Sequence, residues 1–142
     1  MGSADVGIDI SAPAERVWQA VIDIESWPRW TPSATEVKRL DDGPLHVGSR
    51  ARVKQPGMQA LVWEVTELDA GSHFTWVTCL PGVAATARHD INETADGSHL
   101  DVSLEWTGPL AGVVATVYGK RTRQSLTQEA NGHKAASEAS GS

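Results

Sequence analysis

Regular alternation of hydrophobic and polar residues dominates the middle of the chain. Leu100, Val102, Leu104 and Trp106 alternate with polar residues, which is typical of a strand with one buried face and one wet face. Similar patterns bounded by turn residues predict further strands at 6–10, 35–40, 49–54, 59–68, 73–80 and 83–92. Because short turns separate these segments, we expect an antiparallel sheet whose outer face meets water.

Between the first two predicted strands, the spacing of the hydrophobic residues predicts a helix. Val17, Val21 and Ile24 recur at the spacing of one apolar helix face. Ser11 is a suitable N-cap, so the helix is expected to start near residue 12. Two prolines then follow, and we expect residues 27–32 to form a short, bent connector that carries two tryptophans.

A second, longer helix is predicted from Leu110 to about Ala136, with a face that covers the sheet. Three glycines weaken this helix and can let it bend or approach a neighbour closely. The expected apolar stripe comprises Leu110, Val113, Val114, Val117, Tyr118 and Leu126.

The chain has 142 residues, which suits one domain. We expect residues 1–4 to be a vector-derived remnant and N-terminal tail, residues 5–136 to be the domain, and residues 137–142 to be a flexible tail. The net charge of −6 argues against nucleic acid as a partner. A single cysteine and no long apolar run favour a cytoplasmic protein without membrane insertion.

Several segments carry a family resemblance: Ala12–Trp18, the Trp27-Pro-Arg-Trp30 corner, Trp63–Glu67, Phe74-Thr-Trp76 and the helix after Gly108-Pro-Leu110. In their order and spacing, the chain resembles the polyketide cyclase/dehydrase branch of the START-like (SRPBCC) superfamily. The resemblance implies an α+β helix-grip fold, in which about seven antiparallel strands curl around a long C-terminal helix. It also implies two short helices at one end and an apolar cavity between sheet and helix.

The resemblance implies a cavity but no shared catalytic set, so function has to be argued from the cavity. The leading hypothesis is binding of a hydrophobic, lipid-like or polyketide/aromatic small molecule. The alternative is a cyclase, dehydratase or isomerase that acts on such a ligand, with His89 as acid or base. A third hypothesis is an interaction module, which exposed Trp27 and Trp30 would favour; a protein partner is otherwise unknown.

The parity of the predicted strand at 83–92 places His89 on the concave face. Its imidazole can contact a ligand or transfer a proton. The competing interpretations are a packed histidine bonded to a neighbouring carbonyl group and a strand bulge that turns the side chain to solvent. Tyr118 can meet a ligand from the helix; the competing interpretation is an ordinary residue at the edge of the core. His89 and Tyr118 are the catalytic candidates. The predicted ligand-binding residues are Trp63, Trp76, Thr78, His89, Trp106, Val114 and Tyr118.

Metal and cofactor chemistry is not expected. The five histidines are scattered along the sequence without a helical ligand pair, so no metal site is predicted. The chain has neither a glycine-rich phosphate loop after the first strand nor a G-x-S-x-G motif, which argues against nucleotide enzymes and hydrolases.

Overall fold

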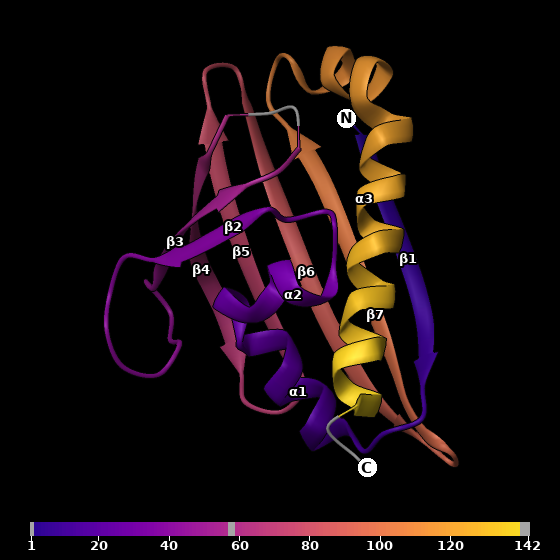
Figure 1. Ribbon diagram of the computed structural model, residues 1–142. Helices are drawn as coiled ribbons and strands as arrows, with labels where there is room; N and C mark the ends of the chain where they lie inside the picture. The colour runs from indigo at the N-terminus through magenta and orange to yellow at the C-terminus, as the bar shows by residue number, and fades with distance from the viewer. Residues whose placement is uncertain (1, 57–58, 140–142) are drawn as a thin grey trace.

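Seven antiparallel strands form one curved sheet in the order β1-β7-β6-β5-β4-β3-β2 (Figure 1). The computed structural model describes residues 2–56 and 59–139. The strands are β1 (Gly2–Ile10), β2 (Glu36–Arg39), β3 (Arg50–Lys54), β4 (Leu61–Asp69), β5 (His73–Leu80), β6 (Val83–Thr94) and β7 (Gly97–Thr107).

The helices occupy one end and one face of this sheet (Figure 1). Helix α1 (Ala14–Ile22), the 3-10 turn η1 (Ile24–Ser26) and the one-turn helix α2 (Trp27–Trp30) close one end. Helix α3 (Ala111–Ala139) runs along the sheet and packs mainly against β1 and β7. The predicted α+β helix-grip fold is therefore confirmed. Within the described residues, no helix has the length and apolar character needed to cross a membrane.

The start of α1 differs from the prediction. The helix begins at Ala14, and Pro13 is the capping residue, with an extended backbone (φ −67°, ψ 153°) and no side-chain cap. Because a proline disfavours helical angles in the residue before it, Ala12 cannot easily begin the helix. Ser11 does not cap the helix; its backbone N–H donates to the Glu138 carboxylate at 2.9 Å.

The tryptophan corner is more regular than the predicted bent connector. Trp27 has helical angles (φ −52°, ψ −41°) and opens α2, which the Thr31 N–H closes by donating to the Trp27 carbonyl. Pro28 is tolerated because its missing N–H falls in the first turn, where no intrahelical bond is lost. Trp27 is 4% exposed and Trp30 39% exposed, so only one indole meets the expectation for an interaction surface.

Parts of both predicted tails belong to regular structure. Strand β1 begins at Gly2, and its residues 2–4 pair with residues 104–106 of β7, so they belong to the sheet. Helix α3 includes residues 137–139, and the Ser137 hydroxyl donates to the His133 carbonyl at 2.6 Å inside the protein. Residues 1 and 140–142, which complete the predicted tails, lie outside the described residues.

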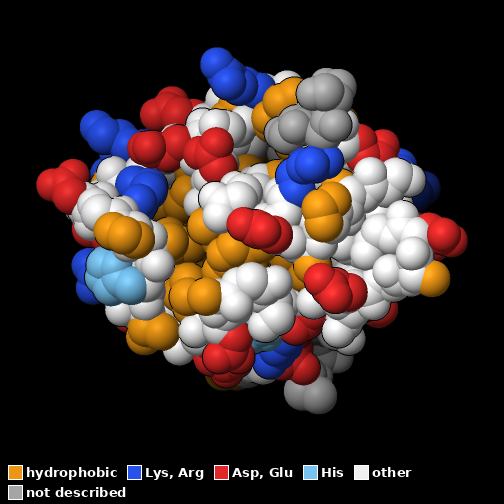
Figure 2. All heavy atoms as spheres, turned by 90° about the horizontal axis from the view of Figure 1, so that it is seen from below, with side chains coloured by type: hydrophobic (Ala, Val, Ile, Leu, Met, Phe, Trp, Pro, Cys, Tyr) orange, Lys and Arg blue, Asp and Glu red, His pale blue; other side chains and the backbone are white. Residues whose placement is uncertain are grey.

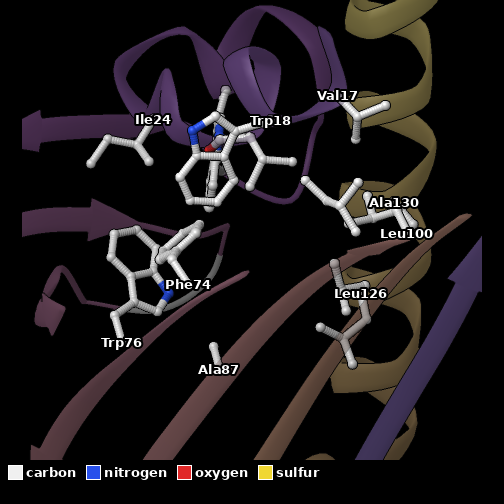
Figure 3. Close-up of a cluster of buried hydrophobic side chains, with 14 of the residues drawn as sticks. Val17, Trp18, Ile24, Phe74, Trp76, Ala87, Leu100, Leu126 and Ala130 are labelled. Carbon is white, nitrogen blue, oxygen red and sulfur yellow. The ribbon is translucent and has the colours of Figure 1, made fainter. Parts of the chain in front are cut away.

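The predicted inner face of the sheet forms the core at the end closed by α1. Phe74 and Trp76 from β5 are buried, and they lie opposite Trp18 of α1 and Ile24 of η1 (Figure 3). Leu126 of α3 is buried beside the same cluster. The period-two alternation therefore assigned the inward side of β5 correctly.

Helix α3 buries only part of the predicted apolar stripe: Leu126 is buried and Val114 half-buried, but the other members are exposed. Val113 is 60% exposed and Val117 64% exposed, whereas small or polar residues fill much of the contact with the rest of the protein. A Cβ atom at Gly132 would lie 2.9 Å from the Trp30 carbonyl oxygen, so α3 and α2 approach closely at that glycine. The buried residues of α3 are Ala111, Leu126, Ala130, Gly132, His133, Ala136 and Ser137.

Two glycine substitutions in α3 test this close approach. Gly132→Ala should lower the free energy of unfolding because the new methyl group meets backbone atoms of α2. Gly112→Ala has open space around the new methyl group and should raise stability by about 0.5–1 kcal/mol through helix propensity. Urea denaturation measures both. Equal stabilisation by the two substitutions would contradict the packing of α3 on α2.

Candidate functional site

Three polar side chains meet inside the protein between the sheet and α3. The Nε2 atom of His89 lies 2.7 Å from Glu129 Oε2. The Nε2 atom of His133 lies 3.2 Å from the same oxygen. His89 is 2% exposed and His133 3% exposed, so this buried triad is a polar cluster within an otherwise apolar core.

The positions of the triad follow from two periodicities. Along β6, Ala87, His89 and Ile91 share the buried side, as the strand pattern predicts. Along α3, Glu129 and His133 stand four residues apart, which places them on one helix side. Sequence reasoning missed both helix residues. Glu129 follows the buried Leu126 by three residues, and His133 follows the buried Ala130 by three. This helical spacing is the signal from which both residues could have been predicted.

Glu129 is ionised in this setting. Burial raises the pKa of its carboxyl group, but the facing imidazoles of His89 and His133, through charge and hydrogen bonds, lower it further, so the net pKa falls well below the ordinary value of 4.5. An ionised carboxylate only accepts hydrogen bonds. Both Nε2–H groups therefore donate to Glu129, and the cluster links the sheet to α3.

Aromatic rings fix the orientation of the two imidazoles. Phe74 stacks on His89 with 4.2 Å between ring centroids and 3° between planes. Trp27 meets His133 edge-on at 5.0 Å, while its own N–H donates to the Val21 carbonyl at 3.1 Å. Rings held on several sides have little freedom to turn, so the triad is preorganised.

The triad is incompletely satisfied and incompletely enclosed. His89 Nδ1 is buried and has no hydrogen-bond partner among the described residues. The Glu129 side chain is 16% exposed, so it is the member of the triad with most contact with solvent. Chemically, this arrangement can hold a proton between imidazole and carboxylate, or it can coordinate a cation.

Two other predicted polar residues lie away from the triad or are already bonded. Tyr118 is 44% exposed and lies about 16 Å from Glu129 along the α3 axis, at 1.5 Å per residue. The Thr78 hydroxyl donates to the Val62 carbonyl at 2.8 Å, so its proton is engaged in the sheet. The structure therefore does not bring Tyr118 to His89.

The predicted aromatic residues form a second, smaller cluster towards the other end of the sheet. Trp106 is buried there with Ala85 and Ala111, and Trp63 and Val114 are partly buried against them. Trp76 joins this cluster to the triad, because its ring lies 5.6 Å from Trp63 and 6.4 Å from His89. A pocket of about 340 Å³ borders Trp106 between β1 and α3; its lining also includes Ala115 and Gly119.

A larger pocket of about 860 Å³ lies outside the core, at the end closed by α1. Figure 2 shows hydrophobic side chains on the floor of a hollow on this face. Its lining combines apolar residues with arginines and includes Trp18, Ile22, Arg29, Trp30 and Leu45. The predicted ligand-binding residues do not line it, so it is separate from the space between sheet and helix.

Comparison with known families and structures agrees with this architecture. The family model described as polyketide cyclase / dehydrase and lipid transport matches residues 1–138. The chain therefore belongs to the polyketide cyclase/dehydrase and lipid transport family. The comparison with curated proteins returned no match.

Solved structures with low sequence identity share the fold. TTHA0849 from Thermus thermophilus is 16% identical, with a TM-score of 0.80 over 99% of this chain and 100% of that chain. The protein jhp0584 from Helicobacter pylori is 14% identical, with a TM-score of 0.77 over 95% and 86%. The Zhui aromatase/cyclase from Streptomyces sp. R1128 is 16% identical, with a TM-score of 0.71 over 96% and 93%.

Replacing the central carboxylate tests whether the triad holds α3 on the sheet. Glu129→Gln should lower the free energy of unfolding at neutral pH by about 3 kcal/mol, because it removes the charged acceptor of two buried imidazole hydrogen bonds. Glu138→Gln is the matched control, since Glu138 is on the same helix and pairs with Lys134 nearer the surface; its effect should stay below about 1 kcal/mol. Urea denaturation with a chelator present measures both. Equal effects would contradict the role of Glu129.

Proposed function

We propose that the protein binds a hydrophobic small molecule between the sheet and the N-terminal half of α3. The ligand is lipid-like, or it is a polyketide or another compound with aromatic rings. Membership of the polyketide cyclase/dehydrase and lipid transport family supports this class of ligand. The site lies beyond the buried triad, because aromatic and aliphatic side chains already fill the end closed by α1.

Half-buried apolar residues on the inner face of the sheet, away from α1, carry the proposal. On β4, Val65 is 1% exposed, whereas the inward-facing Trp63 and Leu61 are only half-buried. On β7, Leu100 is completely buried, and Leu104 is half-buried. Trp63, Leu61 and Leu104 therefore keep solvent-accessible apolar surface near the buried Trp106, and a ligand would cover it.

Helix α3 leaves room for such a ligand. Its closest packing is to β1, β7, α1 and α2, and Val114 on its side towards the sheet is half-buried. The pocket of about 340 Å³ beside Trp106 lies at the small end of the range for ligand sites, roughly 300–1,000 Å³. Indole rings at Trp63 and Trp106 offer flat surfaces for stacking an aromatic ligand.

A cyclase, dehydratase or isomerase is the second candidate. The hydrogen bond between His89 and Glu129 favours it, because a carboxylate that orients an imidazole is a common arrangement for a general base. Tyr118 would contact a different part of a long substrate without taking part in the proton transfer, given its distance from the triad. Loss of turnover in His89→Gln, with Tyr118→Phe still active, would fit this arrangement once a substrate is identified.

Two neighbouring positions on β4 test the ligand-binding site. Trp63 and Val62 point to opposite faces of the strand, and Val62 is 42% exposed on the outer face. Trp63→Ala should weaken binding of a fluorescent hydrophobic probe such as anilinonaphthalene sulfonate by about tenfold, which corresponds to roughly 1.4 kcal/mol of lost contact. Val62→Ala should leave the affinity unchanged. If both variants bind like the wild type, the proposed site is wrong.

A further inference from the structure

We propose that His89, Glu129 and His133 form a binding site for one divalent transition-metal ion, with zinc as the best match. The donor set consists of two imidazole nitrogens and one carboxylate oxygen, and these three atoms all lie within 4.8 Å of one another. Two histidines with one carboxylate are a recurring ligand set for zinc and for ferrous iron. The inference is independent of the hydrophobic ligand proposed above.

The spacing of the donor atoms suits a metal of this size. Ligands at zinc distances of about 2.0–2.1 Å in tetrahedral geometry stand roughly 3.4 Å from one another. In the triad, Glu129 Oε2 lies 2.7 Å from His89 Nε2 and 3.2 Å from His133 Nε2. A metal ion would replace the two Nε2 protons. The distance between the Glu129 oxygen and His89 Nε2 would then have to increase by less than about 1 Å.

The surroundings hold the ligands in place and leave one side open. Phe74 and Trp27 fix the two imidazoles through ring contacts at 4.2 Å and 5.0 Å. Glu129 keeps 16% side-chain exposure while the histidines are nearly sealed. An ion, and a fourth ligand such as water, would therefore enter beside the Glu129 side chain.

The unpartnered nitrogen of His89 also bears on the site. No described residue bonds His89 Nδ1, so only the Glu129 carboxylate favours a proton on Nε2. A cation bound to Nε2 replaces that proton, and the imidazole then carries its hydrogen on Nδ1. Metal-bound histidines usually have an acceptor for that hydrogen, so the site should bind zinc less tightly than sites that supply one.

Other histidines near carboxylates do not offer the same enclosure. On the outer face of the sheet, His73 contacts Asp90 and Glu67, and His99 contacts Asp9 and Asp101. The carboxylates of these surface clusters are from 46% to 89% exposed, which leaves them hydrated. They supply a control for nonspecific binding.

Metal binding is tested by titrating chelator-treated protein with Zn²⁺ in a calorimeter and with Co²⁺ in a spectrophotometer. The wild type should bind one Zn²⁺ per chain, and Co²⁺ should give the visible absorption of a four- or five-coordinate site. His133→Gln should lose at least about 100-fold in affinity, more than the loss of an outer-shell partner causes. His73→Gln should bind like the wild type.

A readout on the unaltered protein guards against a variant that fails to fold. On addition of Zn²⁺, the imidazole NMR signals of His89 and His133 should shift, and those of His73 and His99 should stay in place. Absence of saturable binding by the wild type would overturn the proposal. A loss of affinity in His73→Gln equal to that in His133→Gln, or shifts confined to the surface histidines, would overturn it as well.

Discussion

The hydrogen bonding of one buried carboxylate governs how α3 sits on the sheet. An ionised carboxylate away from bulk water is costly unless it is paired, and Glu129 is paired with His89 from β6 and His133 from its own helix. These bonds require a particular rotation of α3 about its axis and a particular position along it. The apolar contacts around the triad are compatible with that placement.

The rotation of α3 explains its unusual surface. Turning the helix to bury Val113 and Val117 would carry His133 and Gly132 away from their neighbours, because all residues of a helix turn together. Gly132 has to face α2. Val113 and Val117 of the N-terminal half therefore remain exposed. The same placement leaves the inner face of the sheet incompletely covered at that end, which is where the proposed hydrophobic ligand lies.

Much of the sheet could be predicted from the alternation of residue types along the chain. The triad could not, because it depends on contacts between distant segments. The pattern around His89 identifies its inward side, since a strand has a strict period of two. It contains no information about the partner, which lies 40 residues further along the chain. On α3, Leu126 of the predicted stripe is buried, but Val113 and Val117 suggested a face that is exposed. Much of the buried side carries alanine, glycine and serine, which give little hydrophobic signal.

In the tryptophan corner, the tendency of proline to break a helix competes with the packing of Trp27. Two prolines in a short segment indicate an irregular connector, yet Pro28 falls in the first turn of α2, where it is harmless. Trp27 is consequently directed into the core beside His133. Whether a proline breaks or begins a helix depends on its position in the turn, and here tertiary packing of Trp27 favours the helix.

A double-mutant cycle between β6 and α3 measures the central interaction most directly. His89→Leu, Glu129→Leu and the double variant are compared with the wild type by urea denaturation. Each single substitution should be strongly destabilising, and the double variant should be more stable than the sum of the two predicts by over about 1 kcal/mol. Effects that add within about 0.5 kcal/mol would show that His89 and Glu129 are not coupled, which contradicts the account.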